Sequence, residues 1–305
     1  YNPYRGALYS VDELMAGFDP EAPDGYARTL DGRIHRHYRD TGGAEPTDIL
    51  ETLSRRLHDH AITDALQEVL EQRHVVAIMG GHALPRSHPL FLAVAQIARA
   101  LTQKGYLMVS GGGPGAMEAT NLGAWLANRS LADLKDAIRL LSSAPGYDPK
   151  EAWLKTAFEV RRAYPNSPES PAHTISVGIP TWLYGHEPPN IFATHIAKYF
   201  ANSVREDGLL TIARSGIIFA PGSAGTVQEV FQDAAQNHYK TAGDASPMIF
   251  LDQTFWTETT PVFPLLKKLA AGRDYAAYLM VTDDPNEAVE RIEAFRLQRP
   301  GQTVE

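Results

Sequence analysis

Short apolar runs that alternate with longer amphipathic segments are the feature that most restricts how this chain folds. From His74 onward, continuous runs of apolar and often β-branched residues are separated by segments whose apolar positions have helical spacing. Strands without polar alternation are buried on both faces, as in a parallel sheet covered by helices on each side. The runs predict strands at 75–79, 106–110, 174–177, 216–220, 247–251 and 278–281. The segments between them predict helices at 90–104, 117–126, 188–214, 226–239, 263–271 and 285–297.

This order of elements predicts a doubly wound, Rossmann-like α/β fold, with a parallel sheet and helices on both faces. We expect residues 73–305 to form this nucleotide-binding domain, with helices inserted outside the sheet at about 128–171. Residues 1–72 precede it as an N-terminal arm and helical extension. Within them, residues 1–45 have no sustained period and predict an irregular arm, whereas helical spacing of apolar residues in 46–73 predicts one or two helices.

The composition excludes several classes of function. A formal net charge of −8 over 305 residues argues against general binding to nucleic acid, which needs a surplus of Lys and Arg. The chain has no cysteine, so disulfides, thiolate metal sites and a cysteine nucleophile are excluded. No apolar run reaches the roughly 18 residues of a membrane helix and no secretion signal is visible, so we expect a cytoplasmic protein that does not bind membranes. The histidines show no metal-binding spacing, and we expect neither a metal nor an organic cofactor.

Two Gly-rich turns connect predicted strands to predicted helices. Glycines let the backbone come close to a ligand, and the N-terminus of the following helix offers unpaired N–H groups to an anion. The first turn reads Ser110-Gly111-Gly112-Gly113-Pro114-Gly115-Ala116-Met117. The second reads Pro221-Gly222-Ser223-Ala224-Gly225-Thr226-Val227-Gln228-Glu229. In an open parallel sheet both turns lie at the carboxyl ends of strands, where ligands bind.

These turns supply the candidate residues of a phosphate or nucleotide site. We expect the phosphate to lie on the second turn, with the first turn closing the other side of the pocket and the end of the first strand beside it. The candidate binding residues are Gly222, Ser223, Ala224, Gly225, Thr226, Gly112, Gly113, Gly115, Met117, Gly81 and His82. Arg86, His88 and Asn121 are further candidate contacts. One such turn is often only a tight connection, but two together favour a ligand site.

Neither turn matches the better-known nucleotide motifs. The sequence has no G-x-x-x-x-G-K-[ST], and the first strand is not followed by G-x-G-x-x-G. These absences argue against a P-loop NTPase and an NAD dehydrogenase.

The paired turns resemble the signature of the LOG (Lonely Guy) family of nucleotide 5'-monophosphate phosphoribohydrolases, long mislabelled as lysine decarboxylases. The segment Glu187-Pro188-Pro189-Asn190 additionally resembles the larger bacterial purine and pyrimidine nucleotide nucleosidases. The resemblance covers about residues 74–295. Two departures from the family pattern are present: Ser223 replaces a Gly, and Ser203-Val204-Arg205-Glu206 lacks the Met, His and Lys of the family's M-H-x-R-K run.

The resemblance implies hydrolysis of the N-glycosidic bond of a nucleoside 5'-monophosphate by a homodimer, with Arg205 and Glu229 as the catalytic residues. A carboxylate near C1' stabilises an oxocarbenium-like sugar or orients water, and an arginine gives fixed donors to phosphate or base. Without the resemblance, Glu229 is better explained as a first-turn residue favoured by the helix dipole, and Arg205 as part of a solvated helix face. The alternative function is a nucleotide sensor or carrier that binds without cleavage, which the two departures favour.

Overall fold

The computed structural model describes residues 1–166 and 174–298. Within this part of the chain, a single parallel sheet has the strand order β4-β3-β2-β1-β5-β6-β7. Its strands are β1 Val75–Met79, β2 Leu107–Ser110, β3 Ser176–Gly178, β4 His195–Ile196, β5 Ile217–Phe219, β6 Met248–Leu251 and β7 Leu279–Thr282. The chain builds outward from β1 to β4 and then returns to place β5 on the other side of β1. The carboxyl ends of β1 and β5 therefore flank the point where the winding reverses, the usual ligand position of this fold.

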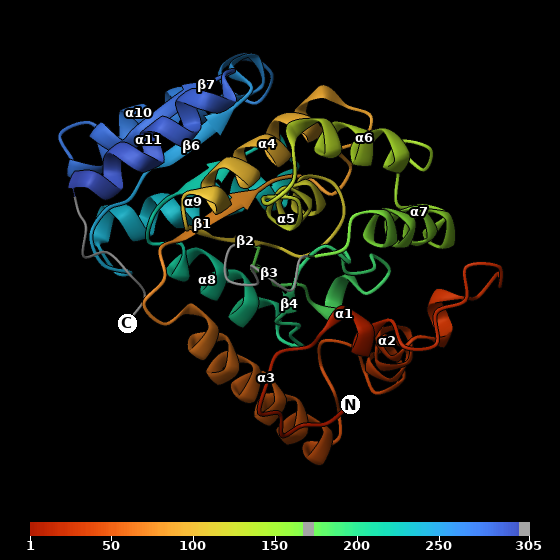
Figure 1. Ribbon diagram of the computed structural model, residues 1–305. Coiled ribbons are helices and arrows are strands. Elements are labelled where there is room, and N and C mark those ends of the chain that lie inside the picture. The colour runs from red at the N-terminus through yellow and green to blue at the C-terminus, as the bar shows by residue number, and fades with distance from the viewer. Residues whose placement is uncertain (167–173, 299–305) are drawn as a thin grey trace.

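Helices cover both faces of the sheet (Figure 1). On one face lie α4 Pro89–Gln103, α5 Ala116–Trp125 and α11 Pro285–Gln298, with α4 packed against the other two. On the other face lie α8 Asn202–Ile212, α9 Ala224–Tyr239 and α10 Val262–Ala270. The predicted doubly wound α/β fold is confirmed.

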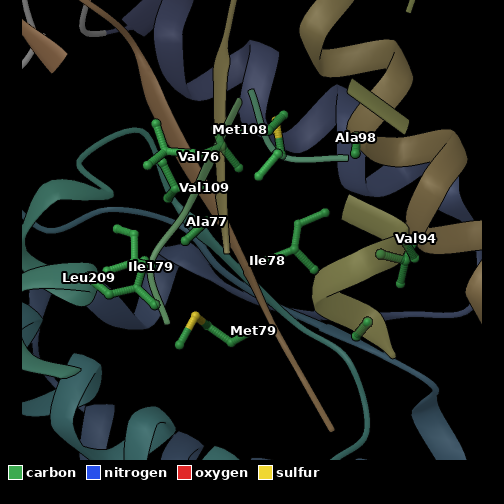
Figure 2. Packing of buried hydrophobic residues seen from close by; sticks show 14 of the residues in the cluster. Val76, Ala77, Ile78, Met79, Val94, Ala98, Met108, Val109, Ile179 and Leu209 are labelled. Carbon is green, nitrogen blue, oxygen red and sulfur yellow. The ribbon is translucent and has the colours of Figure 1, made fainter. Parts of the chain in front are cut away.

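The core lies between the central strands and these two helical layers. Every side chain of β1 is buried, as expected for a strand covered on both faces. Figure 2 shows Val94 and Ala98 of α4 packed on one side of the central strands and Leu209 of α8 on the other. Burial of these β-branched and aliphatic side chains is the main free-energy gain that fixes the sheet.

The predicted insertion forms two helices, α6 Leu131–Leu141 and α7 Lys150–Ala163. A capping box begins α6, because the side chains of Ser130 and Asp133 each accept a hydrogen bond from the other's backbone N–H. Residues 142–149 connect these two helices without regular secondary structure. Residues 167–171 of the predicted range lie outside the described part of the chain.

The N-terminal residues are more ordered than the sequence predicts. Besides the short α1 Val11–Leu14, they form α2 Leu30–Asp40, whose first turn is capped by the Thr29 side chain. The prediction of an irregular arm over 1–45 is therefore wrong for α2. Leu30, Ile34 and Tyr38 have helical spacing, but the other residues of this helix are polar or Gly, so few apolar residues mark it in the sequence.

Residues 46–73 form one long helix, α3 Ile49–Leu70, which begins at the Asp48 cap. Its second half packs on the core, but Ile49 and Leu57 near its start are 72% and 43% exposed. Apolar spacing thus predicted the helix correctly but not which of its residues are buried.

The prediction of one helix over 188–214 is also wrong. The segment contains an irregular stretch, the edge strand β4 and then α8. Asn190 prevents an early helix, because its backbone N–H and its side chain bind the carbonyl oxygens of Gly112 and Gly113 at 2.8 and 3.2 Å. Pairing of His195 and Ile196 with β3 adds sheet hydrogen bonds that a helix would lose.

Candidate functional site

A cavity of about 580 Å³ opens at the carboxyl ends of β1 and β5. Three strand-to-helix turns contribute to its wall, together with the start of α8 and the segment 180–188. The predicted residues that line it are Gly81, His82, Gly113, Met117, Arg205, Ser223, Gly225, Thr226 and Glu229. The two Gly-rich turns, which lie more than a hundred residues apart in the sequence, therefore face one cavity.

The second Gly-rich turn leaves the N-terminus of α9 open to solvent. Ser223, Ala224 and Gly225 are exposed, and no side chain caps this helix end. The first turn of α9 carries no acidic residue, so its N–H groups and the positive end of its dipole face outward without a competing carboxylate. Ser223 has φ −97°, which any residue adopts, so the serine in place of the family's glycine does not strain this turn.

Gly222 does not line the cavity but allows the turn to close. A methyl group at Gly222 would lie 2.1 Å from Oγ1 of Thr226, which is buried beneath the turn. The carbonyl of the preceding Pro221 accepts a hydrogen bond from Gly81 N–H at 3.0 Å. Ala224 is also outside the lining, although it belongs to the exposed helix end.

The first Gly-rich turn forms a wall rather than an open helix end. Gly112 has φ +74° and packs against the backbone of residues 178–179, and Gly115 has φ +69° and packs against the carbonyl oxygen of Gly81. The N–H of Ala116 at the start of α5 already donates to that same oxygen at 3.3 Å. Gly112 and Gly115 thus shape the backbone, while Gly113 reaches the cavity.

Arg205 is buried at the back of the cavity. Its Nε donates to the carbonyl oxygen of Ile179 at 2.7 Å and its Nη2 to that of Gly111 at 3.5 Å. The alternative interpretation of Arg205 as a solvated helix face is therefore wrong. Within residues 1–166 and 174–298, Nη1 of this guanidinium has no hydrogen-bond partner, which leaves donors for a ligand.

Glu229 lies one turn inside α9 and faces the same cavity. Burial raises the pKa of its carboxyl group to about 7; nearby Arg205 opposes this shift and nearby Glu206 adds to it. No ion pair within 4.0 Å joins Arg205 and Glu229 in the described part of the chain. Arg205 and Glu229 therefore influence each other electrostatically without forming a direct ion pair, and both line the cavity.

Several other residues of the cavity are not predicted site residues, among them Asn202, Glu206, Tyr184, His186 and Glu187. Glu187 Oε1 lies 3.5 Å from Nδ1 of His82 and 3.8 Å from Nε2 of His186. The one signal in the sequence was the Glu187-Pro188-Pro189-Asn190 resemblance. The described residues contain no group of three or more His, Asp or Glu side chains arranged to hold a metal ion.

Three residues considered as ligand contacts have structural roles. Arg86 is buried and donates to both carboxylate oxygens of Glu118; the distance from its Nε to Oε2 is 2.8 Å. The side chain of His88 caps the start of α4. Asn121 is buried and accepts hydrogen bonds from Ser110 Oγ and Asn190 Nδ2 at 2.9 and 3.0 Å. Met117, by contrast, lines the cavity, with its side chain over the first Gly-rich turn.

Comparison with known proteins identifies neither a family model nor a curated protein that matches this chain. Among solved structures, the chain is similar to a molybdenum cofactor binding protein from Rippkaea orientalis, with 14% identity over 73% of this chain and 98% of that one and a TM-score of 0.45. It is similar to the molybdenum cofactor carrier protein of Chlamydomonas reinhardtii, with 12% identity over 74% and 99% of the two chains and a TM-score of 0.44. TM1055, a structural genomics target, gives 18% identity over 72% and 99% and a TM-score of 0.42.

These similarities are too distant to assign a ligand or an activity to this chain. The Rossmann-like fold that the family resemblance implies is confirmed by the strand order and the two helical layers. The nucleosidase assignment and the roles of the site residues stay predictions. No helix in the described residues is long and apolar enough to span a membrane.

Proposed function

We propose that this chain binds a nucleoside 5'-monophosphate at the carboxyl ends of β1 and β5 and hydrolyses its N-glycosidic bond. The observation that carries the proposal is that the open N-terminus of α9, the buried guanidinium of Arg205 and the carboxyl group of Glu229 all face one cavity. An anion site, a cation and a titratable carboxyl group are the parts that cleavage of a sugar phosphate from its base requires.

The phosphate fits the exposed turn at Ser223–Gly225. Helix N–H groups and the α9 dipole attract an anion there, and the hydroxyl of Ser223 adds a donor. Because no side chain caps this helix end, a bound phosphate displaces no protein partner.

Hydrolysis breaks the bond between C1' and the base nitrogen and forms a bond from C1' to a water oxygen. As the base departs, positive charge develops on the sugar, and the carboxylate of Glu229 stabilises it while accepting the proton of the attacking water. The leaving base takes up a proton from solvent and Glu229 then releases its proton to solvent, so the products are free base and ribose 5-phosphate. Arg205 holds the substrate in place by its remaining N–H donors.

The direct test is incubation of the protein with a panel of 5'-monophosphates, followed by chromatography for free base and ribose 5-phosphate. We expect the wild-type chain to release base, and Glu229→Gln and Arg205→Ala to lose at least about 100-fold in kcat, as removal of single catalytic groups commonly does. Glu290→Gln and Arg139→Ala change the same residue types at exposed positions and should keep full activity. Equal activity in Glu229→Gln and wild type would refute the proposed role of Glu229.

A second candidate function is binding without cleavage, as in a nucleotide sensor or carrier. The observation that favours it is that Arg205 already donates to two backbone carbonyl groups, which fixes the guanidinium but occupies part of it. Tight binding of AMP in calorimetry with no base released from any nucleotide would establish this alternative. The cytoplasmic location and the homodimer stay predictions, for which cell fractionation and sedimentation are the tests.

A further inference from the structure

The helix that carries Arg205 does not cap its own N-terminus. The N-cap residue of α8 is Ala201, which has no side chain able to accept a hydrogen bond. Asp59 of α3 instead holds the two residues that precede the first helical residue, Asn202: Oδ1 accepts a hydrogen bond from the N–H of Phe200 at 2.9 Å and Oδ2 accepts one from the N–H of Ala201 at 2.8 Å. A carboxylate from the N-terminal extension therefore fixes the start of α8.

Asp59 is itself held by a buried chain of hydrogen bonds. His58 Nδ1 lies 3.0 Å from Oδ1 of Asp59, and His58 Nε2 lies 2.8 Å from the hydroxyl oxygen of Tyr9. All three side chains are buried. The backbone of Tyr9 is fixed in turn by two hydrogen bonds to Ile196 of β4, at 3.0 and 2.9 Å.

The ring of Phe200, directly before α8, is enclosed by aromatic side chains. Ring centroids lie 4.6 Å from Tyr1, 5.0 Å from His58 and 4.5 Å from Trp182. Tyr1 and His58 belong to the N-terminal extension, so this extension holds Phe200 both by ring packing and by a hydrogen bond to its N–H.

Ala201, which Asp59 binds, and Arg205, which lines the cavity, lie one helical turn apart on α8. Arg205 N–H donates to the carbonyl oxygen of Ala201 at 3.2 Å, and the Arg205 side chain then reaches Ile179 at the cavity wall. Helical geometry transmits any shift of Ala201 to Arg205, because the intervening turn is rigid on this length scale.

We propose that Asp59 is a positioning residue for Arg205, and that residues 1–72 complete the site by holding α8 in register with the cavity. The extension thus contributes to catalysis without touching substrate. This inference rests on the proposed function for its kinetic consequence, but its structural consequence is measurable without any ligand.

The kinetic test compares Asp59→Asn with Asp64→Asn, an exposed position on the same helix whose side chain is 66% exposed. Asn keeps one acceptor but presents N–H donors toward the backbone N–H groups, so α8 loses part of its anchor. We expect kcat for 5'-monophosphate hydrolysis to fall by about 10-fold or more, because a displaced Arg205 no longer holds the substrate in the reactive geometry. Asp64→Asn should match wild type.

A double-mutant cycle separates positioning from a general loss of structure. If Asp59 acts through Arg205, then Asp59→Asn added to Arg205→Ala lowers kcat by less than about 2-fold further. If Asp59→Asn lowers kcat by the same factor in the Arg205→Ala background as in wild type, the proposal is overturned.

Hydrogen exchange gives the readout that needs no activity. We expect amides 200–206 to exchange faster in Asp59→Asn than in wild type, while those of α4 keep their protection. Unchanged exchange at 200–206 would overturn the positioning role, even if wild type hydrolyses nucleotides. If wild type releases no base but amides 200–206 exchange faster in Asp59→Asn, only the proposed hydrolysis is overturned. The faster exchange would still support the role of Asp59.

Discussion

The guanidinium of Arg205 lies directly against the backbone of Gly111, and a methyl group at Gly111 would stand 2.5 Å from its Nη2 and 2.7 Å from Sδ of Met117. The first Gly-rich turn therefore has a role that its phosphate-like sequence does not suggest. It clears the space that an arginine from α8 occupies. The contact between Gly111 and Arg205 also links the two halves of the sheet, because Gly111 follows β2 and Arg205 lies on α8, which precedes β5.

Gly111→Ala is expected to displace Arg205 and abolish most activity, because the added methyl group cannot share space with the guanidinium. We expect a loss of at least about 100-fold in kcat, as a displacement of about 1 Å can cause. The control is Gly208→Ala on α8, where a methyl group meets no atom within 4 Å. Steady-state kinetics of both variants, with circular dichroism to verify folding, make the comparison; wild-type kinetics in Gly111→Ala contradict it.

Gly225→Ala distinguishes a phosphate site from a simple helix start. A methyl group at Gly225 meets no protein atom within 4 Å, and alanine favours the helix, so stability should stay equal or rise by about 0.5–1 kcal/mol. If phosphate approaches this helix end, the methyl group obstructs it, and the Kd for ribose 5-phosphate in calorimetry should rise about 10-fold or more. Unchanged affinity would place the anion elsewhere.

The pH dependence of hydrolysis should report Glu229. Its pKa is raised to about 7, so the fraction present as carboxylate, the form that accepts a proton, increases as pH rises through 7. We expect kcat/KM to rise between about pH 6 and 8 on this account. Glu206→Gln removes a nearby negative charge that raises this pKa, so the rise should move to lower pH. A profile that stays in place in Glu206→Gln contradicts the assignment.

Asp233→Asn is expected to stabilise the protein at high pH. Asp233 is buried, its Oδ2 has no hydrogen-bond partner among the described residues, and burial raises its pKa from 3.8 to about 8. The folded state therefore keeps a proton that the unfolded state releases, so wild-type stability falls as pH rises from about 4 to about 8. Asn mimics the protonated form without this dependence. The Tm advantage of the variant should grow between about pH 5 and 8, and a constant difference would disprove the linkage.

Removal of Arg86 should destabilise the fold strongly. Arg86→Met leaves the carboxylate of Glu118 buried and uncompensated, at an expected cost of about 3–5 kcal/mol in the free energy of unfolding. Arg139→Ala, which breaks an exposed ion pair with Asp136, should cost less than about 1 kcal/mol. Urea denaturation of the two variants measures the difference, and similar costs would show that burial of the Arg86 pair has little effect.

The strands and their following helices could be predicted because local pattern and tertiary environment agree there. The predicted strand at 75–79 matches β1, since five consecutive apolar residues are stable only when covered on both sides. The predicted helix at 226–239 matches α9 to within two residues at its start. In contrast, β4 and α2 depend on partners distant in sequence. His195 of β4 pairs with β3, and Asp31 of α2 accepts a hydrogen bond from the buried Lys198.

What the sequence by itself determined is the doubly wound fold and the two Gly-rich turns, because apolar periodicity and glycine chemistry act over a few residues. The candidate pair Arg205 and Glu229 came from the family resemblance and stays a prediction. Only the tertiary structure decided which turn offers open N–H groups and which one makes room for a side chain. It also decided that Asp59, far from the site in sequence, anchors the helix of Arg205. These decisions depend on atoms brought within 3 Å of one another by the packing of separate elements, and no local pattern encodes such contacts.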